Sequence, residues 1–308
     1  MDDGNTVRDD SDVVDLQLDR PHSARMYDYF LGGITNFPAD REAVAQAIAA
    51  FPSALIAARS NRAFMRRSTR HLAQLGIDQF WDIGTGIPTS PNLHEVAQSV
   101  IHRARVVYTD NDPIVLTHAR ALLHSHPEGA TAYMQADVTD PEALLAHPTL
   151  RSTLDFDRPV ALSLNALLHF VTDEHHDVHG IVKTLKDALP SGSVLVVSHA
   201  TPDFDPEAIS RVTATYRQAG TPVQARARDE IARFFDGWTL LEPGIQPILR
   251  WRPRLKCEAL MKPQRWAIAA IVSPAACRRA RSRRHCSSRR CCIHRLTVMS
   301  SSSKSLCR

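Results

Sequence analysis

The sequence predicts an α/β fold: a doubly wound, mostly parallel, Rossmann-like sheet of seven strands. Two observations predict it. From residue 77 onward, short apolar runs alternate with helix-like segments, which is the pattern of parallel strands joined by helices. Within this region, Phe80 to Pro113 reads as a strand, a glycine turn, a helix, a second strand and an acid. We expect residues 77–253 to form this domain.

Residues 19–76 contain helical patterns and no strand pattern. Proline and glycine mark the ends of these helices, and their apolar side chains recur at helical spacing. The expected helices are 21–30, 41–51 and 56–75. We expect them to form an N-terminal cap over the carboxyl edge of the sheet. Residues 1–18 are polar and rich in aspartate, which predicts a disordered arm.

The sheet region is divided by the change between short apolar runs and helical spacing. The expected strands are 79–83, 105–109, 131–135, 160–165, 193–198, 239–242 and 246–251. The expected helices are 92–101, 113–123, 141–146, 176–189, 206–219 and 227–235. The last strand could pair antiparallel, and the others are expected to be mainly parallel.

The turn Gly84-Thr85-Gly86 is the first candidate binding feature. Glycine adopts backbone conformations that other residues avoid, and it lets a ligand approach without a Cβ in the way. The N–H groups at the start of the following helix favour an electron-rich group. Asp110 ends the next strand, where an acid can accept hydrogen bonds from ribose hydroxyls. The spacing therefore predicts a site for an adenosine-containing ligand.

Two residues argue against a dinucleotide. The pyrophosphate-binding pattern needs a third glycine, whereas this turn continues into Ile87 and Pro88. Asp82 also places a carboxylate at the turn, where it would repel a pyrophosphate and could hold an ammonium group. A ligand with an adenosine end and a cationic amino-acid end satisfies both Asp82 and Asp110. S-adenosylmethionine is such a ligand.

Several segments carry a family resemblance. They are RPHSARMYDYFLGG (20–33), NFPADREA (36–43), NRAFMRR (61–67), DIGTGIPT (82–89), VVYTDNDPIVLTHARALL (106–123) and SHATPDFDPEA (198–208). In combination they resemble an actinobacterial S-adenosyl methyltransferase family of unknown substrate, within the class I methyltransferases. The resemblance covers roughly Asp19 to Pro253. It implies the class I methyltransferase fold and S-adenosylmethionine as cofactor.

The resemblance also implies roles for residues at the strand ends. Asp82 would accept from the cofactor ammonium, with Gly84, Thr85 and Gly86 beneath the amino-acid portion. Asp110 would take the ribose hydroxyls and Asn111 would lie beside it, whereas Asp112 is expected to cap the next helix. Asp137 and Val138 would contact adenine, unless Asp137 belongs only to a polar loop before a helix capped by Asp140. Asn165 would face the place where the methyl group is presented.

Four upstream residues fall in matching segments. Arg25 or Arg62 could pair with the cofactor carboxylate, although pairing on a helix surface explains each arginine equally well. Tyr27 and Asn61 are further candidates for the cofactor site, and Tyr27 could equally be a core aromatic.

His169 and His199 are the candidate catalytic bases. Each follows an apolar strand-like stretch, and imidazole titrates near neutrality. A structural histidine is the commoner alternative. The cluster DEHHDVH (173–179) lacks any metal-binding spacing, so no metal is expected.

Charge and cysteine divide the chain near residue 253. Residues 254–308 carry 14 of the 37 Lys and Arg, one of the 33 Asp and Glu, and all six cysteines. The body is therefore acidic, at −9, and the tail basic, at +13. We expect the tail to be disordered or the product of a reading-frame shift, the alternative being nonspecific nucleic-acid contact. A cysteine-free body argues against a disulfide framework and a thiolate nucleophile.

The sequence thus predicts an S-adenosylmethionine-dependent methyltransferase that acts on O, N or C of a small-molecule acceptor. Two alternatives remain, a non-catalytic sensor of the same ligand and an NAD-dependent oxidoreductase. No signal peptide and no run of about 20 apolar residues is visible, so a cytoplasmic protein without a membrane partner is expected. The acidic body disfavours a nucleic-acid substrate.

Overall fold

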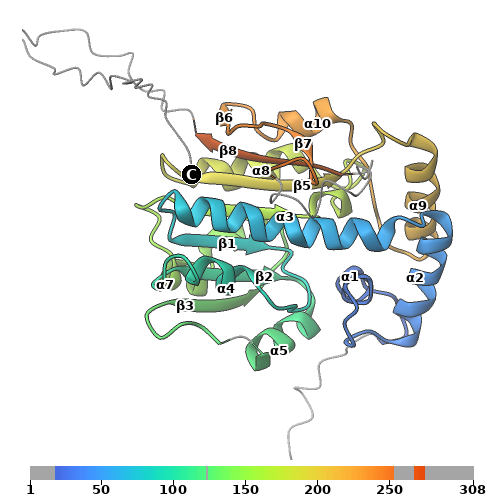
Figure 1. Ribbon diagram of the computed structural model, residues 1–308, viewed down its shortest axis with the longest axis horizontal. Coiled ribbons are helices and arrows are strands. Elements are labelled where there is room, and N and C mark those ends of the chain that lie inside the picture. Colours follow the sequence, from blue (N-terminus) through green and yellow to red (C-terminus); the bar gives the residue numbers. More distant parts are fainter. Residues whose placement is uncertain (1–17, 123, 253–266, 275–308) are drawn as a thin grey trace, which may run out of the picture. The chain divides into compact units, whose positions relative to one another are not determined.

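The computed structural model describes residues 18–122, 124–252 and 267–274 of the 308-residue chain, with the backbone alone for 120–122 and 267–274. In this part of the chain, eight strands form one sheet in the order β3-β2-β1-β4-β5-β8-β6, with β7 pairing to β8 (Figure 1). The strands are β1 Gln79–Ile83, β2 Arg105–Asp110, β3 Ala130–Gln135, β4 Ala161–Asn165, β5 Val194–Ala200, β6 Trp238–Leu240, β7 Gln246–Pro247 and β8 Ala267–Pro274.

The first five strands are parallel, and the last three pair antiparallel. The switch in strand order lies between β1 and β4, where a ligand site is expected at the carboxyl ends of the strands. The α/β class and the parallel five-stranded core agree with the sequence prediction. The count of seven strands does not, because β8 lies in a segment for which no strand is predicted.

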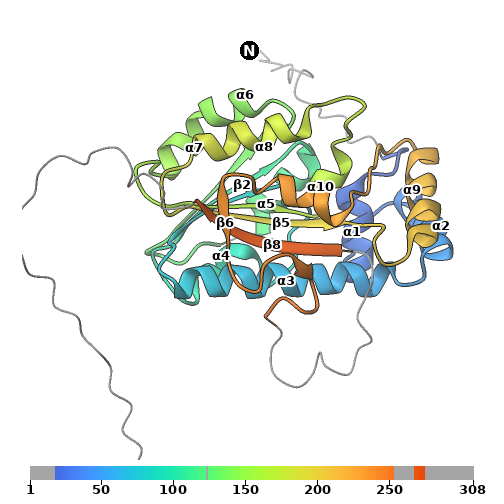
Figure 2. The ribbon, with the colours of Figure 1, turned by 90° about the horizontal axis from the view of Figure 1, so that it is seen from above.

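Helices occupy both faces of the sheet (Figure 2). The helices are α1 Ser23–Leu31, α2 Pro38–Ala50, α3 Ala54–Gln74, α4 Leu93–Gln98, α5 Pro113–Leu122, α6 Pro141–Ala146, α7 Pro148–Thr153, the 3-10 helix η2 Leu168–Phe170, α8 Val178–Asp187, α9 Pro206–Gln218 and α10 Arg228–Arg233. Helices α6, α7 and α8 cover one face, and α3 and α4 the other. Helices α1, α2 and α9 lie beyond the carboxyl ends of the parallel strands (Figure 1).

Side chains alternate between the two faces along each central strand. In β1, Trp81 packs with α6 to α8, whereas Phe80 packs with Phe64 and other residues of α3 and α4. This period of two follows from the pleat, and it fills a core on each side of the sheet. A third core joins α1, α2 and α3 around residues such as Met26 and Phe30.

An Asp-Pro pair begins several of the helices. In α6 and α9, Asp140 and Asp205 accept hydrogen bonds from backbone N–H groups of the first turn, at 3.0 Å each, and proline follows. Asp112 does the same for α5, since its Oδ1 accepts from the Ile114 N–H at 2.8 Å. Proline at the first helical position loses no hydrogen bond there, which explains these helix starts. Asp112 therefore has the predicted capping role.

The predicted strand 246–251 is mostly wrong, because only Gln246–Pro247 pairs with the sheet. The next residues form turns held against α3. Arg67 donates from Nε to the Trp251 carbonyl at 3.1 Å, and the buried Trp251 ring meets Phe64 edge-on at 5.4 Å between ring centroids. The helix α7 was also not predicted.

The predicted tail 254–308 is wrong over Ala267–Pro274, which forms β8 between β5 and β6. Its short run of apolar and β-branched residues suits a strand, and the basic residues around it obscured that signal. The predicted arm at 1–17 and the rest of the predicted tail, 254–266 and 275–308, lie outside the described residues.

No helix in the described ranges is alone long and apolar enough to cross a membrane, and α2 with α3 meets that requirement only as a pair bent by 102°.

Candidate cofactor and acceptor site

The glycine turn after β1 is open toward a cavity. Gly84 and Gly86 have φ values of 73° and 65°, in the left-handed region that favours glycine. A Cβ on Gly84 would lie 2.7 Å from Leu167 Cδ1, so the turn can approach the loop after β4 only without a side chain. No atom lies within 4 Å of the position a Cβ on Gly86 would take. The space beside Gly86 is therefore available to a ligand, and both glycines line a cavity of about 240 Å³.

Asp110 ends β2 and is tied to this turn through its carboxylate. Oδ2 accepts from the Gly86 N–H at 2.9 Å, and Oδ1 accepts from the Asp112 N–H at 3.0 Å. Each oxygen keeps a lone pair for another donor. Burial raises the pKa of Asp110, although both backbone hydrogen bonds oppose that shift. Asp110 thus combines a structural role in the turn with a place in the cavity wall.

Asp82, near the end of β1, is the least compensated acid of the cavity. Its side chain makes no hydrogen bond or ion pair with any described residue, and it is only 8% exposed. Burial raises the pKa of Asp82 to about 7, with Arg62 opposing the rise and Asp110 adding to it. A buried carboxylate without a hydrogen bond or an ion pair favours a cationic partner, because the attraction between the two charges would offset the free-energy cost of desolvating the carboxylate.

Thr85 holds the turn itself. Its hydroxyl donates to the Asp82 carbonyl at 3.1 Å and lies 3.3 Å from the Thr109 carbonyl. The side chain therefore serves the backbone, and its position on the cavity wall is that of a supporting residue.

Asn111, Asp137 and Val138 lie together at the ends of β2 and β3. Asn111 donates from Nδ2 to Asp137 Oδ2 at 3.1 Å, and Thr139 donates to Oδ1 from its N–H at 2.9 Å and its hydroxyl at 2.8 Å. Burial raises the pKa of Asp137, but these hydrogen bonds outweigh it and leave the pKa below its ordinary value. All three predicted residues line the cavity, while Asp140 caps α6.

Asn165 ends β4, and its amide group lacks partners. Both Oδ1 and Nδ2 are buried without a hydrogen bond to any described residue, and Asn165 lines the cavity. Ala166, the next residue, has a φ of 53°, an uncommon conformation for a residue with a Cβ. Ser198 on β5 holds this backbone, because its carbonyl and hydroxyl accept from the Ala166 N–H at 3.1 and 2.9 Å.

Tyr27 and Asn61 support this loop from the helices. The Asn61 amide donates to the Tyr27 hydroxyl at 2.9 Å, and its Oδ1 accepts from the Ser198 hydroxyl at 2.6 Å. The Tyr27 hydroxyl donates in turn to the Ala58 carbonyl at 3.0 Å. Both residues line the cavity, but their polar atoms are engaged with one another, with Ala58 and with Ser198. They connect α1 and α3 to β5.

Arg62 lies on α3 and holds the segment that follows the glycine turn. One of its terminal nitrogens donates to the Thr89 carbonyl and, at 3.0 Å, to Asn92 Oδ1. Its Nε has no hydrogen-bond partner among the described residues. Arg62 lines the cavity and is the cation whose field acts on Asp82.

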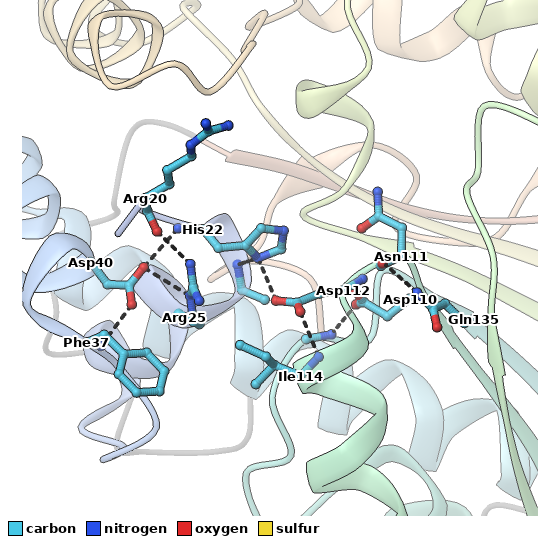
Figure 3. Close-up of polar contacts among 12 residues, drawn as sticks. Arg20, His22, Arg25, Phe37, Asp40, Asp110, Asn111, Asp112, Ile114 and Gln135 are labelled. Carbon is cyan, nitrogen blue, oxygen red and sulfur yellow. Dashed lines mark hydrogen bonds and ion pairs between the residues drawn. The ribbon is translucent and has the colours of Figure 1, made fainter. Parts of the chain in front are cut away.

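Arg25 does not line the cavity, so its predicted contact with a cofactor carboxylate is wrong. The side chain is buried and pairs through Nε with Asp40 Oδ1 at 3.2 Å (Figure 3). The same Asp40 oxygen accepts from the His22 N–H at 2.8 Å, and His22 Nδ1 lies 3.0 Å from Asp112 Oδ2. Arg25 therefore stabilises the start of α1, and the cavity-lining His22, which sequence reasoning missed, links that start to the loop after β2.

His199 is not a candidate base, because both of its ring nitrogens are occupied. Arg226 can only donate, so His199 Nε2 accepts from it at 3.1 Å, and Nδ1 donates to the Ala200 carbonyl at 2.7 Å. Burial, with His169 and Arg226, holds the pKa of His199 well below its ordinary value. The predicted catalytic role fails because the histidine lies inside the core and away from the cavity wall.

His169 does line the cavity, and neither ring nitrogen makes a hydrogen bond with a described residue. Burial and the nearby Arg226 lower the pKa of His169 to about 4, so its imidazole is neutral at pH 7. Arg226 holds the segment that carries it, by donating to the carbonyls of Leu168 and Val171 at 2.9 Å each.

The histidines of residues 173–179 take separate partners. His175 hydrogen-bonds with Thr172 at 2.8 Å, and His179 stacks on Phe234 at 4.6 Å between ring centroids. Among the described residues, the group that could hold a metal is His102, His126 and Glu128, which lie outside the cavity.

The fold and the site together define a class. A parallel sheet whose strand ends carry a glycine turn, an unpaired acid and a second acid beside the turn is typical of nucleoside-cofactor enzymes.

A family model described as S-adenosyl methyltransferase matches residues 9–276, and the chain belongs to this family. It is an S-adenosylmethionine-dependent methyltransferase, and S-adenosylmethionine is its cofactor. The match extends beyond Pro253, where the resemblance visible in the sequence ends, and it includes β8.

Two solved structures are similar over most of their length. A DUF574 family protein from Streptomyces avermitilis MA-4680 is 46% identical with a TM-score of 0.82, over 84% of this chain and 100% of that one. A Thermobifida fusca YX protein assigned as a methyltransferase is 40% identical with a TM-score of 0.78, over 84% and 97% of the two chains. A search of curated proteins finds no match to this chain.

Proposed function

We propose that the protein transfers the methyl group of S-adenosylmethionine to a small-molecule acceptor bound in the same cavity. The observation that carries the proposal is the unpaired Asp82 carboxylate beside the open turn at Gly86. An acid without a partner at this place fits the ammonium of an amino-acid-like ligand and disfavours a pyrophosphate. The NAD-dependent alternative is therefore the weaker one.

The cavity offers a suitable group for each part of the cofactor, from its amino-acid end to its adenine. We propose that Asp82 takes the ammonium, that the bare backbone at Gly84 and Gly86 lies beneath the amino-acid portion, and that the free lone pairs of Asp110 accept from the ribose hydroxyls. Val138 would pack on adenine and Asp137 would accept from it. Arg62 is the cation available to the carboxylate, since Arg25 is engaged with Asp40.

The cofactor supplies a methyl group on a positively charged sulfur, which is a strong electrophile with a good leaving group. The residues of this chain are then needed mainly to orient the acceptor and to exclude water. Asn165 is placed for the first task, because its unpaired amide lies at the end of β4 in the cavity wall.

We further propose that α1, α2 and α3 act as a cap over the site. His22 and Tyr27 from the start of the chain line the cavity together with strand-end residues. The His22–Asp112 contact and the hydrogen bond from the Ser198 hydroxyl on β5 to Asn61 join this part to the sheet region at two places. These contacts support a cap that encloses the ligands. The predicted cytoplasmic location stays a prediction.

Cofactor binding is expected to depend on pH through Asp82. Burial raises the pKa of Asp82 to about 7, with Arg62 opposing the rise and Asp110 adding to it, so the carboxylate is half protonated near neutrality. Raising the pH from 6 to 7.5 ionises Asp82 and should strengthen binding several-fold, whereas above about 8 the cofactor α-amino group loses its proton. Calorimetry across this range should give a maximum between the two values. In Asp82→Asn, the increase in cofactor affinity between pH 6 and 7.5 should disappear. If this variant kept the pH dependence of the wild type, Asp82 would not be the group that binds the cofactor ammonium.

The function is tested by calorimetric titration with S-adenosylmethionine, S-adenosylhomocysteine and NAD, followed by a search for transfer of labelled methyl groups to low-molecular-weight acceptors. Binding of the first two ligands and not of NAD is expected, with label recovered in a small molecule. Binding of NAD alone would refute the proposal. If S-adenosylmethionine binds and its label never leaves it, a sensor role is favoured.

A further inference from the structure

The cavity has two chemically different ends. Its acidic and basic lining residues other than histidine belong to the sheet end and its rim, namely Arg62, Asp82, Asp110 and Asp137. The other end lies between α1, the first turns of α3, η2 and α9. None of the lining residues from η2, α9 or residues 51–58 carries a formal charge at neutral pH, since His169 is neutral there.

We call this second end the acceptor chamber, and aromatic rings form much of it. Its aromatic lining residues are Phe30, Phe51, Phe170 and Tyr216. Phe170 and Tyr216 approach with ring centroids 6.2 Å apart, and the aliphatic side chains of Ile209, Val212 and Val223 complete the wall. Such a surface suits a flat, apolar molecule, because aromatic rings pack well by edge and by face.

The chamber also contains three polar groups without protein partners. The Asn165 amide is buried with both atoms unpaired, and neither His169 nitrogen makes a hydrogen bond with a described residue. The Tyr216 hydroxyl likewise has no hydrogen bond in the described ranges, and burial raises the pKa of Tyr216. Unpaired polar groups in an apolar wall are costly unless a ligand or water satisfies them. Three such groups on one chamber indicate a ligand with a small polar substituent.

We propose that the acceptor chamber binds a neutral aromatic compound bearing a hydroxyl group, and that this compound is the methyl acceptor. The rings of Phe170 and Tyr216 would hold the aromatic body, and Asn165 and His169 would hydrogen-bond the hydroxyl. A charged acceptor is excluded by the same argument, because the chamber offers no opposite charge to offset desolvation. This inference rests on the proposed function, and it specifies its substrate class.

The reaction balances with the groups present. The hydroxyl oxygen gains the methyl group and loses its proton, while the sulfur keeps the electron pair of the bond that breaks. A neutral His169 can accept the hydroxyl proton and pass it to water. Asn165 Nδ2 can donate to the oxygen and fix its direction.

The first test measures binding without any turnover. The fluorescent probe 2-naphthol is titrated into the protein alone and into the protein saturated with S-adenosylhomocysteine. Its matched controls carry the same rings with a charge, 2-naphthoate and 2-naphthylmethylammonium, and cyclohexanol carries a hydroxyl without an aromatic ring. We expect 2-naphthol to bind at least about tenfold more tightly than each control. Equal or tighter binding of a charged probe would overturn the proposal.

The second test fills the chamber. Val212 on α9 lines it, whereas Ala214 is exposed on the same helix, so Val212→Trp and Ala214→Trp add the same bulk inside and outside. Val212→Trp should weaken 2-naphthol binding at least about tenfold and leave S-adenosylmethionine binding within about threefold of wild type. Ala214→Trp should change neither. Undiminished 2-naphthol binding in Val212→Trp would refute the chamber.

The third test asks for product, which should be 2-methoxynaphthalene formed from labelled S-adenosylmethionine. His169→Phe should lower kcat about 100-fold and change the pH dependence of kcat, with cofactor affinity unchanged. Failure of the wild-type protein to bind S-adenosylmethionine would refute the proposed function. The probe titrations would still show whether the acceptor chamber prefers a neutral aromatic compound with a hydroxyl group. Cofactor binding without any 2-methoxynaphthalene would refute the acceptor class alone.

Discussion

Replacing Asp110 with alanine is expected to weaken S-adenosylmethionine binding by about 1–3 kcal/mol, or roughly 5- to 150-fold. The change removes the proposed acceptor for the ribose hydroxyls. It also releases the N–H groups of Gly86 and Asp112, which donate to the two carboxylate oxygens in the structure. The variant therefore lacks both the hydrogen bonds that hold the glycine turn and the proposed hydrogen-bond acceptor for the ribose hydroxyls. Calorimetric titration of the purified variant measures the effect.

Two controls separate these contributions. Asp110→Asn keeps an oxygen for the Gly86 N–H but removes the charge and one acceptor, so an intermediate loss is expected. Asp137→Ala removes a side chain already satisfied by Asn111 and Thr139, and a smaller loss than that of Asp110→Ala is expected. Wild-type affinity in Asp110→Ala would remove this residue from the binding site.

Replacing Arg226 with methionine should lower the free energy of unfolding by about 3–5 kcal/mol. The guanidinium is fully buried and donates to the carbonyls of Leu168 and Val171, to His199 Nε2 and, at 2.6 Å, to Asp173 Oδ1. Methionine fills similar volume but leaves the buried acceptors on Leu168, Val171 and His199 without this donor, whereas the exposed Asp173 can turn to water. The midpoint of urea unfolding measures the loss.

The matched control for Arg226→Met is Arg211→Met. Arg211 is exposed on α9 and lies 4.0 Å from Glu207, one helical turn away. An exposed pair of this kind contributes less than about 1 kcal/mol, so its loss should be barely measurable. A change below 1 kcal/mol in Arg226→Met as well would contradict the role assigned to the buried arginine.

The fold could be predicted where local signals were strong. The glycine turn, the Asp-Pro helix starts and the apolar strands placed the elements from β1 to α10, except α7 and η2, with small errors at their ends. The missed strand β8 shows the limit of such signals. Its apolar run is short and lies among basic residues, and its pairing with β5 joins residues that are distant in the sequence.

The sequence predicted those residues of the candidate site whose positions follow from a backbone motif. It predicted less well the residues whose role depends on the direction of a long side chain. Asp82, Gly84, Gly86 and Asp110 follow from the turn itself, and all line the cavity. Arg25 and His199 were chosen from neighbouring segments, yet their side chains turn into the core. The spacing of residues in a sequence does not show with which buried acceptor a guanidinium or an imidazole will form a hydrogen bond.

Three cavity features had no sequence signal. The positive φ of Ala166 depends on Ser198, which lies on another strand. The acceptor chamber depends on α9, which the sequence placed correctly as a helix but could not orient toward η2. The place of His22 in the wall depends on its contact with Asp112. Each is a tertiary effect between segments far apart in the chain.

The position of β8 has a consequence for how the molecule is made. Among the described strands, β6 and β7 pair with β8 and with no other, and β8 lies between them and β5. During synthesis the parallel strands can associate early, but β5 stays an open edge until residue 274 has left the ribosome. A nascent or shortened chain that stops near residue 253 would expose that edge to a second molecule. Of the strands in the described residues, β8 is made last, and it covers the edge of β5 that could otherwise pair with a second molecule.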